Sequence, residues 1–283
     1  MTQSDVVMHH GRSIIQHGHY NNRVYIMKLA TEDAPDIIRI ADDLAGKEHY
    51  GKIFAKVPKS LETLFSEHGY CTEATVPFFF HGDEPAVFMA KYSDSARSVM
   101  KDTTVSSNVL STAFSHAGER HAYSLPDGFS LMQAHAGDAD DIAVLFENVF
   151  RTYPFPVTDP SYIRQSMQGD TRYYIIRKSH MLAAVASCEI DITNRNIEVT
   201  DFATSPLFRG RGFASHLLYA IESAMEKEGI VLSYTICRAI SGAINSVFAS
   251  AGYAYAGQLP NNTNICGRIE SMNVWYRKLN GVR

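Results

Sequence analysis

Two spacings of apolar residues, one typical of strands and one typical of helices, alternate along the chain from about residue 129 onward. Short apolar or alternating runs, which are typical of strands, occur at residues 129–134, 173–177, 182–190, 197–204, 231–237, 253–258 and 273–278. Apolar spacings of three and four residues, which are typical of helices, occur at residues 138–149, 161 onward, 213–228 and 241–251. This order predicts an α/β fold whose sheet is mixed, with parallel and antiparallel strands (α+β), and with one central crossover.

The first half of the chain has a less regular pattern. Residues 1–22 carry four histidines among Gly, Ser and Gln, which is typical of a flexible, solvated arm. An extended segment at 23–28 and a helix that begins near Asp33 open a first domain, expected over 23–92. The Ser- and Thr-rich stretch 93–127 is typical of a connector, with one short helix, and leads to a second domain over 128–283.

Composition narrows the class of protein. The 283 residues are 45% hydrophobic and 20% charged, which excludes a disordered chain and permits one or two cores. A net charge of -4 without a basic run argues against nucleic acid or an anionic membrane as a partner. No apolar stretch approaches the roughly 20 residues that cross a bilayer, and no signal peptide is visible, so we expect a soluble, cytoplasmic protein. The four cysteines are scattered, which predicts free thiols and no metal site.

The most informative segment is DFATSPLFRGRGFA at 201–214. A predicted strand ends here in a turn that contains Gly210 and Gly212, and a long helix follows. The glycines leave backbone N–H groups uncovered, and the helix directs its positive end to the same place, which is an arrangement that binds pyrophosphate. Arg209 and Arg211 add positive charge. The spacing fits neither the phosphate loop of kinases nor the glycine-rich turn of dinucleotide-binding dehydrogenases.

This segment resembles the signature of the GNAT acetyltransferases, in which Arg or Gln is followed by two residues, Gly, one residue, and then Gly or Ala. Arg209, Gly212 and Ala214 meet that pattern. The resemblance covers about residues 129–278 and implies a GNAT fold in the C-terminal half, with acetyl-CoA as co-substrate. The residues that it places on acetyl-CoA are Phe202, Ala203, Thr204, Arg209, Gly210, Arg211, Gly212, Phe213 and Ala214.

Three further segments narrow the resemblance. The stretch NNTNICGRIESMNVWYRKL at 261–279, TDFAT at 200–204 and YPFP at 153–156 are similar to the β-lysine N-acetyltransferases. This likeness implies transfer of an acetyl group to the terminal (ε) amine of β-lysine by direct attack in a ternary complex. The product, Nε-acetyl-β-lysine, serves some organisms as a compatible solute.

Acetylation of such an amine requires a base, because an ammonium with a pKa of about 10.4 is almost fully protonated at pH 7. Glu198 and Asp201, on the predicted strand at 197–204, are the candidate catalytic carboxylates. They lie three residues apart, so both reach one substrate only if the strand bulges. Asp201 is the first choice, since polyamine-type members of the superfamily have an acidic residue at this place. The structural alternative is a carboxylate paired with a core Arg or Tyr.

The group that protonates the leaving thiolate is less clear. Phe248 stands where many GNAT enzymes have a tyrosine, and Ser241 stands where an Asn would contact CoA. Asn245, one helical turn later, is therefore a candidate CoA ligand. The tyrosines that remain as candidate acids are Tyr234, Tyr253 and Tyr255.

Substrate selection is expected to fall to the loop after the first helix of the second domain and to the segment before the last strand. Tyr153 and Phe155 offer walls for an aliphatic chain. The candidate polar ligands of the substrate are Asn262, Asn264 and Glu270. A substrate carboxylate would need a cation, for which Arg238 and Arg268 are the candidates, although each of these polar residues is equally typical of a turn or a surface.

An internal likeness bears on the first domain. The pattern F-x-x-x-G-Y occurs at Phe65–Tyr70 and again at Phe248–Tyr253, each time at the end of a predicted helix. The first domain is therefore predicted to be a partial GNAT-like unit that lacks the phosphate turn, binds no CoA, and extends the sheet or covers the substrate side. Chance similarity of two helix ends is the alternative.

Two other functions fit the same residues. One is acetylation of a different small amine, such as a polyamine, lysine or an aminoglycoside. The other is a noncatalytic acyl-CoA sensor that has kept the phosphate turn and lost the chemistry. The sequence leaves the oligomeric state open, a homodimer included.

Overall fold

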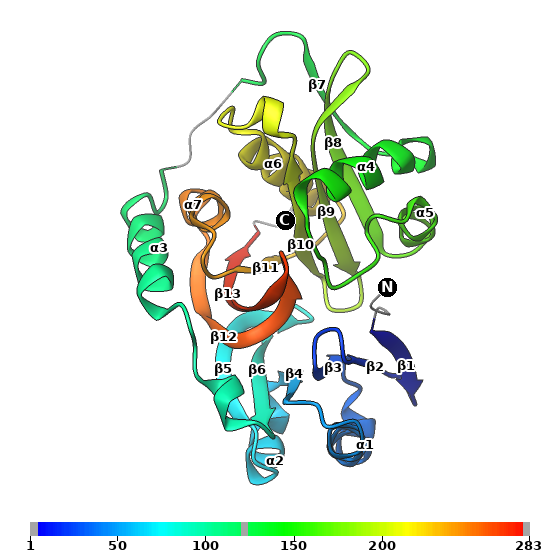
Figure 1. The fold of residues 1–283 in the computed structure, drawn as a ribbon, viewed down its shortest axis with the longest axis vertical. Coiled ribbons are helices and arrows are strands. Elements are labelled where there is room, and N and C mark those ends of the chain that lie inside the picture. The colour runs from blue at the N-terminus through cyan, green and yellow to red at the C-terminus, as the bar shows by residue number, and fades with distance from the viewer. Residues whose placement is uncertain (1–4, 120–123, 280–283) are drawn as a thin grey trace.

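Helices and strands alternate along the computed structural model, which describes residues 5–119 and 124–279 (Figure 1). The first half contains β1 (Val6–His10), β2 (Ser13–Gly18), β3 (Arg23–Lys28), α1 (Ala34–Lys47), β4 (Lys52–Pro58), α2 (Glu62–Glu67), β5 (Cys71–Phe80), β6 (Glu84–Tyr92) and α3 (Thr103–Ser115). The second half contains β7 (Phe129–Gln133), α4 (Ala139–Val149), α5 (Pro160–Gln168), β8 (Thr171–Lys178), β9 (Met181–Asp191), β10 (Asn196–Thr204), α6 (Phe213–Lys227), β11 (Leu232–Arg238), α7 (Gly242–Ser250), β12 (Ala254–Ile265) and β13 (Arg268–Lys278). The order predicted for residues 129–278 is thus the observed order.

All these strands join one mixed sheet in the order β1-β2-β3-β4-β6-β5-β12-β13-β11-β10-β9-β8-β7. Two pairs are parallel, β3 with β4 across α1, and β10 with β11 across α6. The order β1-β2-β3-β4-β6-β5 in the first half matches β8-β9-β10-β11-β13-β12 in the second. The two halves therefore share a topology, and they meet edge to edge at β5 and β12.

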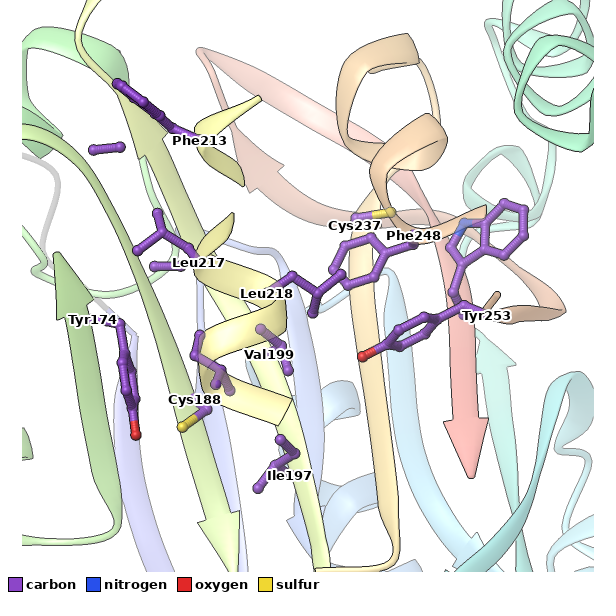
Figure 2. Packing of buried hydrophobic residues seen from close by; sticks show 14 of the residues in the cluster. Tyr174, Cys188, Ile197, Val199, Phe213, Leu217, Leu218, Cys237, Phe248 and Tyr253 are labelled. Carbon is purple, nitrogen blue, oxygen red and sulfur yellow. The ribbon is translucent and has the colours of Figure 1, made fainter. Parts of the chain in front are cut away.

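Four apolar clusters hold the sheet and its helices. Side chains of α6 and α7 pack on one face of the second half, where Leu218 lies beside Val199 and Phe248 (Figure 2). Helices α4 and α5 cover the opposite face. Helices α1 and α2 cover one face of the first half. The fourth cluster joins the halves, because Phe54 and Phe88 from the first half pack with Tyr234 of β11.

The structure corrects one expectation for the first half. The described part of the expected flexible arm, from residue 5 onward, contains β1 and β2, which form a hairpin at the edge of the sheet. Residues 1–4 lie outside the described residues. Ile15 of that hairpin is fully buried in the cluster beneath α1, and this apolar contact outweighs the polar composition of the segment. The helix expected in the connector is α3, whose Phe114 packs against Trp275. No helix in the described part of the chain is long and apolar enough to cross a membrane.

The junction between the halves depends on Gly257. This residue pairs with Ala74 of β5 and has a φ of 149°, and a Cβ built on it would lie 2.3 Å from the Glu73 carbonyl oxygen. Both the close approach and the positive φ require glycine. Gly257 therefore lets β12 approach β5 closely enough to continue the sheet.

Replacing Gly257 with Ala should lower the free energy of unfolding by about 3 kcal/mol, because the methyl group pushes β5 and β12 apart. Urea unfolding followed by circular dichroism measures this. The matched control is Gly229→Ala, which also has a positive φ of 81° but nothing within 4 Å of the new methyl group. That control should lose only about 1 kcal/mol. Equal losses in the two variants would contradict the close-packed junction.

Candidate active site

A β-bulge interrupts β10 at the predicted catalytic carboxylate. Thr200 pairs with Ser187 and Ala203 pairs with Val185, so that Asp201 and Phe202 lie opposite a single residue of β9. Asp201 has a φ of 54°, which is uncommon for a residue other than glycine. The extra residue shifts the alternation of side chains by one position. Glu198 and Asp201 therefore line the same cavity. A bulge was the condition under which both carboxylates could reach one substrate.

The bulge lies where β10 leaves β11. The two strands pair only from Asn196 with Leu232 to Glu198 with Tyr234, and beyond that point they separate. A cavity of about 660 Å³ opens between them, lined by the later residues of both strands, by the 153–155 loop, and by the turn at 209–214. This volume is in the range of small-molecule sites.

The glycine-rich turn forms one end of the cavity. Gly210 and Gly212 have φ values of 74° and 71°, and α6 begins at the next residue, Phe213. The left-handed conformation at Gly212 would be strained for any residue with a side chain. The first N–H groups of α6 have no carbonyl partner within the helix, so they and the helix dipole favour a bound anion.

The residues expected on acetyl-CoA lie around this turn with two exceptions. Phe202, Thr204 and all residues of 209–214 line the cavity. The side chain of Ala203 instead packs in the cluster beneath α4 and α5. Asn245 is fully buried outside the cavity, so its side chain is not placed to contact a ligand there.

Neighbouring groups use both polar ends of the Asn245 side chain. Its Nδ2 donates to the carbonyl oxygens of Arg238 and Ser241 at 2.9 and 2.8 Å. Its Oδ1 accepts from Trp275 Nε1 and from Asn273 Nδ2, both at 2.9 Å. Asn245 therefore fixes the turn from β11 into α7 against β13.

Asp201 accepts hydrogen bonds on both carboxylate oxygens. The Tyr153 hydroxyl donates to Oδ1, and the Ser187 hydroxyl donates to Oδ2 at 2.5 Å. Burial raises the pKa of Asp201 above its ordinary value, although the bonds from Ser187 and Tyr153 act in the opposite direction. A carboxylate with a raised pKa is a better proton acceptor than an ordinary one.

Glu198 has a different environment. Its Oε2 accepts from the Tyr234 hydroxyl at 2.8 Å and lies 3.6 Å from Lys56 Nζ. Glu198 is therefore paired with a cation of the protein itself, whereas no Lys or Arg of the described residues forms an ion pair with Asp201. Between the two predicted carboxylates, the geometry favours Asp201 as the base.

Sequence reasoning missed a third carboxylate, Glu189. It pairs across β9 and β10 with Glu198 and lines the cavity. Desolvation and then the charges of Glu198 and Asp201 raise its pKa. Glu189 therefore adds a third carboxyl group to the cavity, and its raised pKa favours the neutral form unless a cation lies beside it.

The predicted substrate residues fall into two sets. Tyr153, Phe155 and Asn262 line the cavity. Asn264 lies outside it, where its Nδ2 donates to the Tyr20 carbonyl oxygen at 2.8 Å and so ties β12 to the β2–β3 turn.

Glu270 also lies outside the cavity, so the structure brings neither Asn264 nor Glu270 to the predicted substrate site. Its carboxylate accepts from Arg238 through two bonds of 2.8 Å, and it also lies 3.3 Å from Arg268 Nε. Both arginines proposed for a substrate carboxylate are therefore already paired with Glu270.

None of the three candidate acids, Tyr234, Tyr253 and Tyr255, lies in the described lining of the cavity. Tyr234 donates to Glu198, and the Tyr253 hydroxyl bonds Ser233 Oγ at 2.5 Å. A thiol with a pKa of about 8.5 is a tolerable leaving group without an acid.

The strand topology, the bulge and the anion-binding turn define an N-acetyltransferase of the GNAT type. Residues 142–241 match the family model described as the acetyltransferase (GNAT) family. The β-lysine N(6)-acetyltransferase of Methanococcus maripaludis is 37% identical over 265 residues, which are 94% of this chain and 96% of that one. The enzyme of the same name from Methanosarcina mazei is 31% identical over 256 residues, 83% of this chain and 94% of that one.

Among solved structures, the ribosomal-protein-S18-alanine N-acetyltransferase from Escherichia coli aligns with a TM-score of 0.48 at 15% identity, covering 55% of this chain and 96% of that chain. The chain belongs to the GNAT acetyltransferase family, and it is an acetyl-CoA-dependent N-acetyltransferase.

The bond from Tyr153 to Asp201 gives a prediction for the pH dependence. If Asp201 is the base, activity should be lost as pH falls through the raised pKa of this carboxyl group. Tyr153→Phe removes a donor to the carboxylate and should move the acidic limb of the kcat/KM profile upward by about one pH unit. The control Tyr174→Phe changes a buried tyrosine outside the cavity and should leave the limb in place. If the acidic limb of the kcat/KM profile stays in place in Tyr153→Phe, Asp201 is not the titrating base.

Proposed function

We propose that the protein transfers the acetyl group of acetyl-CoA to the ε-amine of β-lysine in a ternary complex. The observation that carries this proposal is the continuity of one cavity from the glycine-rich turn to the carboxylates Asp201, Glu198 and Glu189. The names of the two curated relatives, which align along most of this chain, support β-lysine as the substrate.

In this proposal the phosphates of acetyl-CoA bind at Gly210–Phe213, and the thioester lies between the separated ends of β10 and β11. Asp201 holds the ε-ammonium and accepts its proton, directly or through a water molecule. The free amine attacks the thioester carbonyl, so that a C–N bond forms and the C–S bond breaks. A backbone N–H near Ala203 or Thr204 stabilises the oxyanion. CoA leaves as the thiolate, and the second proton of the attacking nitrogen passes to that thiolate through water, which gives the neutral amide and the free thiol.

We also infer that the predicted first domain at 23–92, extended at its start by β1 and β2, is a partial GNAT-like unit that binds no CoA and is joined through 93–127 to the catalytic unit at 128–283. The shared strand order supports this proposal. The equivalent of the phosphate turn lies between β3 and α1, where the sequence LATED contains no glycine. Glu32 and Asp33 are acidic at the start of that helical segment and would repel a phosphate.

A thiol-release assay with acetyl-CoA against β-lysine, lysine, ornithine and spermidine tests the substrate. We expect kcat/KM for β-lysine to exceed the others by about 10-fold or more. Asp201→Asn should lower kcat at pH 7 by about 100-fold. Asp43→Asn, on the exposed face of α1, is the matched control and should retain full activity.

Two results would contradict this proposal in different ways. A preference for spermidine would contradict the substrate but retain the acetyl transfer. Tight CoA binding without turnover of any amine would favour the acyl-CoA sensor. Activity of Asp201→Asn within a few-fold of the wild type would remove Asp201 from the base role.

A further inference from the structure

Arg23 is a buried cation in the wall of the cavity. It begins β3 in the first half of the chain, and only 3% of its surface is exposed. Its Nη1 donates to the Asn262 carbonyl oxygen at 2.7 Å and to Thr263 Oγ1 at 3.2 Å. Its guanidinium carbon lies 4.8 Å from the centre of the Tyr25 ring.

The other edge of this guanidinium has no partner. Nε is buried and makes no hydrogen bond, and Nη2 makes none to any residue of 5–119 or 124–279. No carboxylate in these ranges forms an ion pair with Arg23. A buried arginine without a carboxylate at ion-pair distance is costly, and burial lowers the pKa of Arg23, although the charges of Tyr25, Asp5 and Glu198 act in the opposite direction. Nε and Nη2 together form the edge of the guanidinium that binds a carboxylate through two parallel hydrogen bonds.

Other cations near the cavity are already engaged. Arg238 and Arg268 bind Glu270. Arg97 donates to three backbone carbonyl oxygens, those of Asn261, Asn22 and Asn21. Lys56 faces Glu198. Among the described residues that line the cavity outside the phosphate turn, Arg23 is thus the cation whose Nε and Nη2 remain available for a carboxylate.

The position of Arg23 fits one end of an amino-acid substrate. Its ring partner Tyr25 lies 5.6 Å from Lys56 Nζ, and Lys56 in turn lies 3.6 Å from Glu198. Arg23, the cross-strand pair Glu198 and Glu189, and Asp201 all line this one cavity. β-Lysine carries a carboxylate, a nearby ammonium and a distant ammonium, which is the complementary set of charges.

We propose that Arg23 binds the substrate carboxylate through Nε and Nη2, and so selects amino-acid amines over simple diamines. This inference rests on the proposed function, because it assigns the specificity of the same cavity. The cation comes from the half of the chain that lacks the phosphate turn. The first half would then supply the substrate-selecting wall of an active site whose acetyl-CoA turn lies in the second half.

The test compares two substrates that differ only in the carboxylate, β-lysine and 1,4-diaminopentane. Wild-type kcat/KM should favour β-lysine by about 100-fold or more. Arg23→Met should lower kcat/KM for β-lysine by about 100-fold, mainly through KM, and should change that for the diamine by less than about threefold. Arg23→Lys keeps the charge but lacks the two parallel donors of a guanidinium. Its kcat/KM for β-lysine should therefore lie between that of the wild type and that of Arg23→Met. Arg39→Met, on the exposed face of α1, is the control and should leave both substrates unchanged.

A structural role for Arg23 would lower turnover of both substrates equally, together with acetyl-CoA affinity measured by calorimetry, and that result would overturn the proposal. Equal wild-type use of the two substrates would overturn it as well. If the wild type acetylates lysine but not β-lysine, the proposed function is wrong, and lysine with 1,5-diaminopentane then decides the role of Arg23 by the same comparison.

Discussion

The active site depends on the β-bulge at Asp201. Without the extra residue, Glu198 and Asp201 would point to opposite faces of β10, and β10 would have no local reason to leave β11 after their three paired residues. With it, both carboxylates face one cavity, and the strand ends beside the start of α6. One local irregularity therefore brings both carboxylates and the anion-binding turn to the same cavity, at the cost of a left-handed backbone at a residue other than glycine.

A second constraint is the folding of the sheet onto itself. The two halves have the same strand order and meet at β5 and β12, and their facing surfaces enclose Tyr234 between aromatic rings of the first half. This packing brings Lys56 to Glu198 and Arg23 to the far wall of the cavity. The first half, which repeats the strand order of the second but lacks the phosphate turn, thus contributes charged residues to the cavity of the second half. The cavity is built from both halves of the chain.

The sequence predicted best what local chemistry determines. The glycine turn, the order of elements after residue 129 and the pair Glu198 and Asp201 were all readable, because each depends on neighbours within a few residues. The place of Asn245 could not be read from the sequence, because its partner Trp275 is 30 residues away on β13. Arg23 and Glu189 were missed because strand register alone brings them to the cavity, and no motif within β3 or β9 records that register. The β1–β2 hairpin was missed because the histidines, Gly, Ser and Gln of residues 1–22 were given more weight than the apolar residues at 6–8 and 14–15.

The most direct test of the account is a crystal structure with CoA and Nε-acetyl-β-lysine, the two expected products. The account predicts the pyrophosphate against the N-terminus of α6 at Gly210–Phe213, and the acetylated nitrogen within hydrogen-bond distance of the Asp201 carboxylate, between the separated ends of β10 and β11. A product amide bound on the other face of β10, or nearer to Glu198 than to Asp201, would contradict the claim that the bulge joins the amine and the thioester in one site.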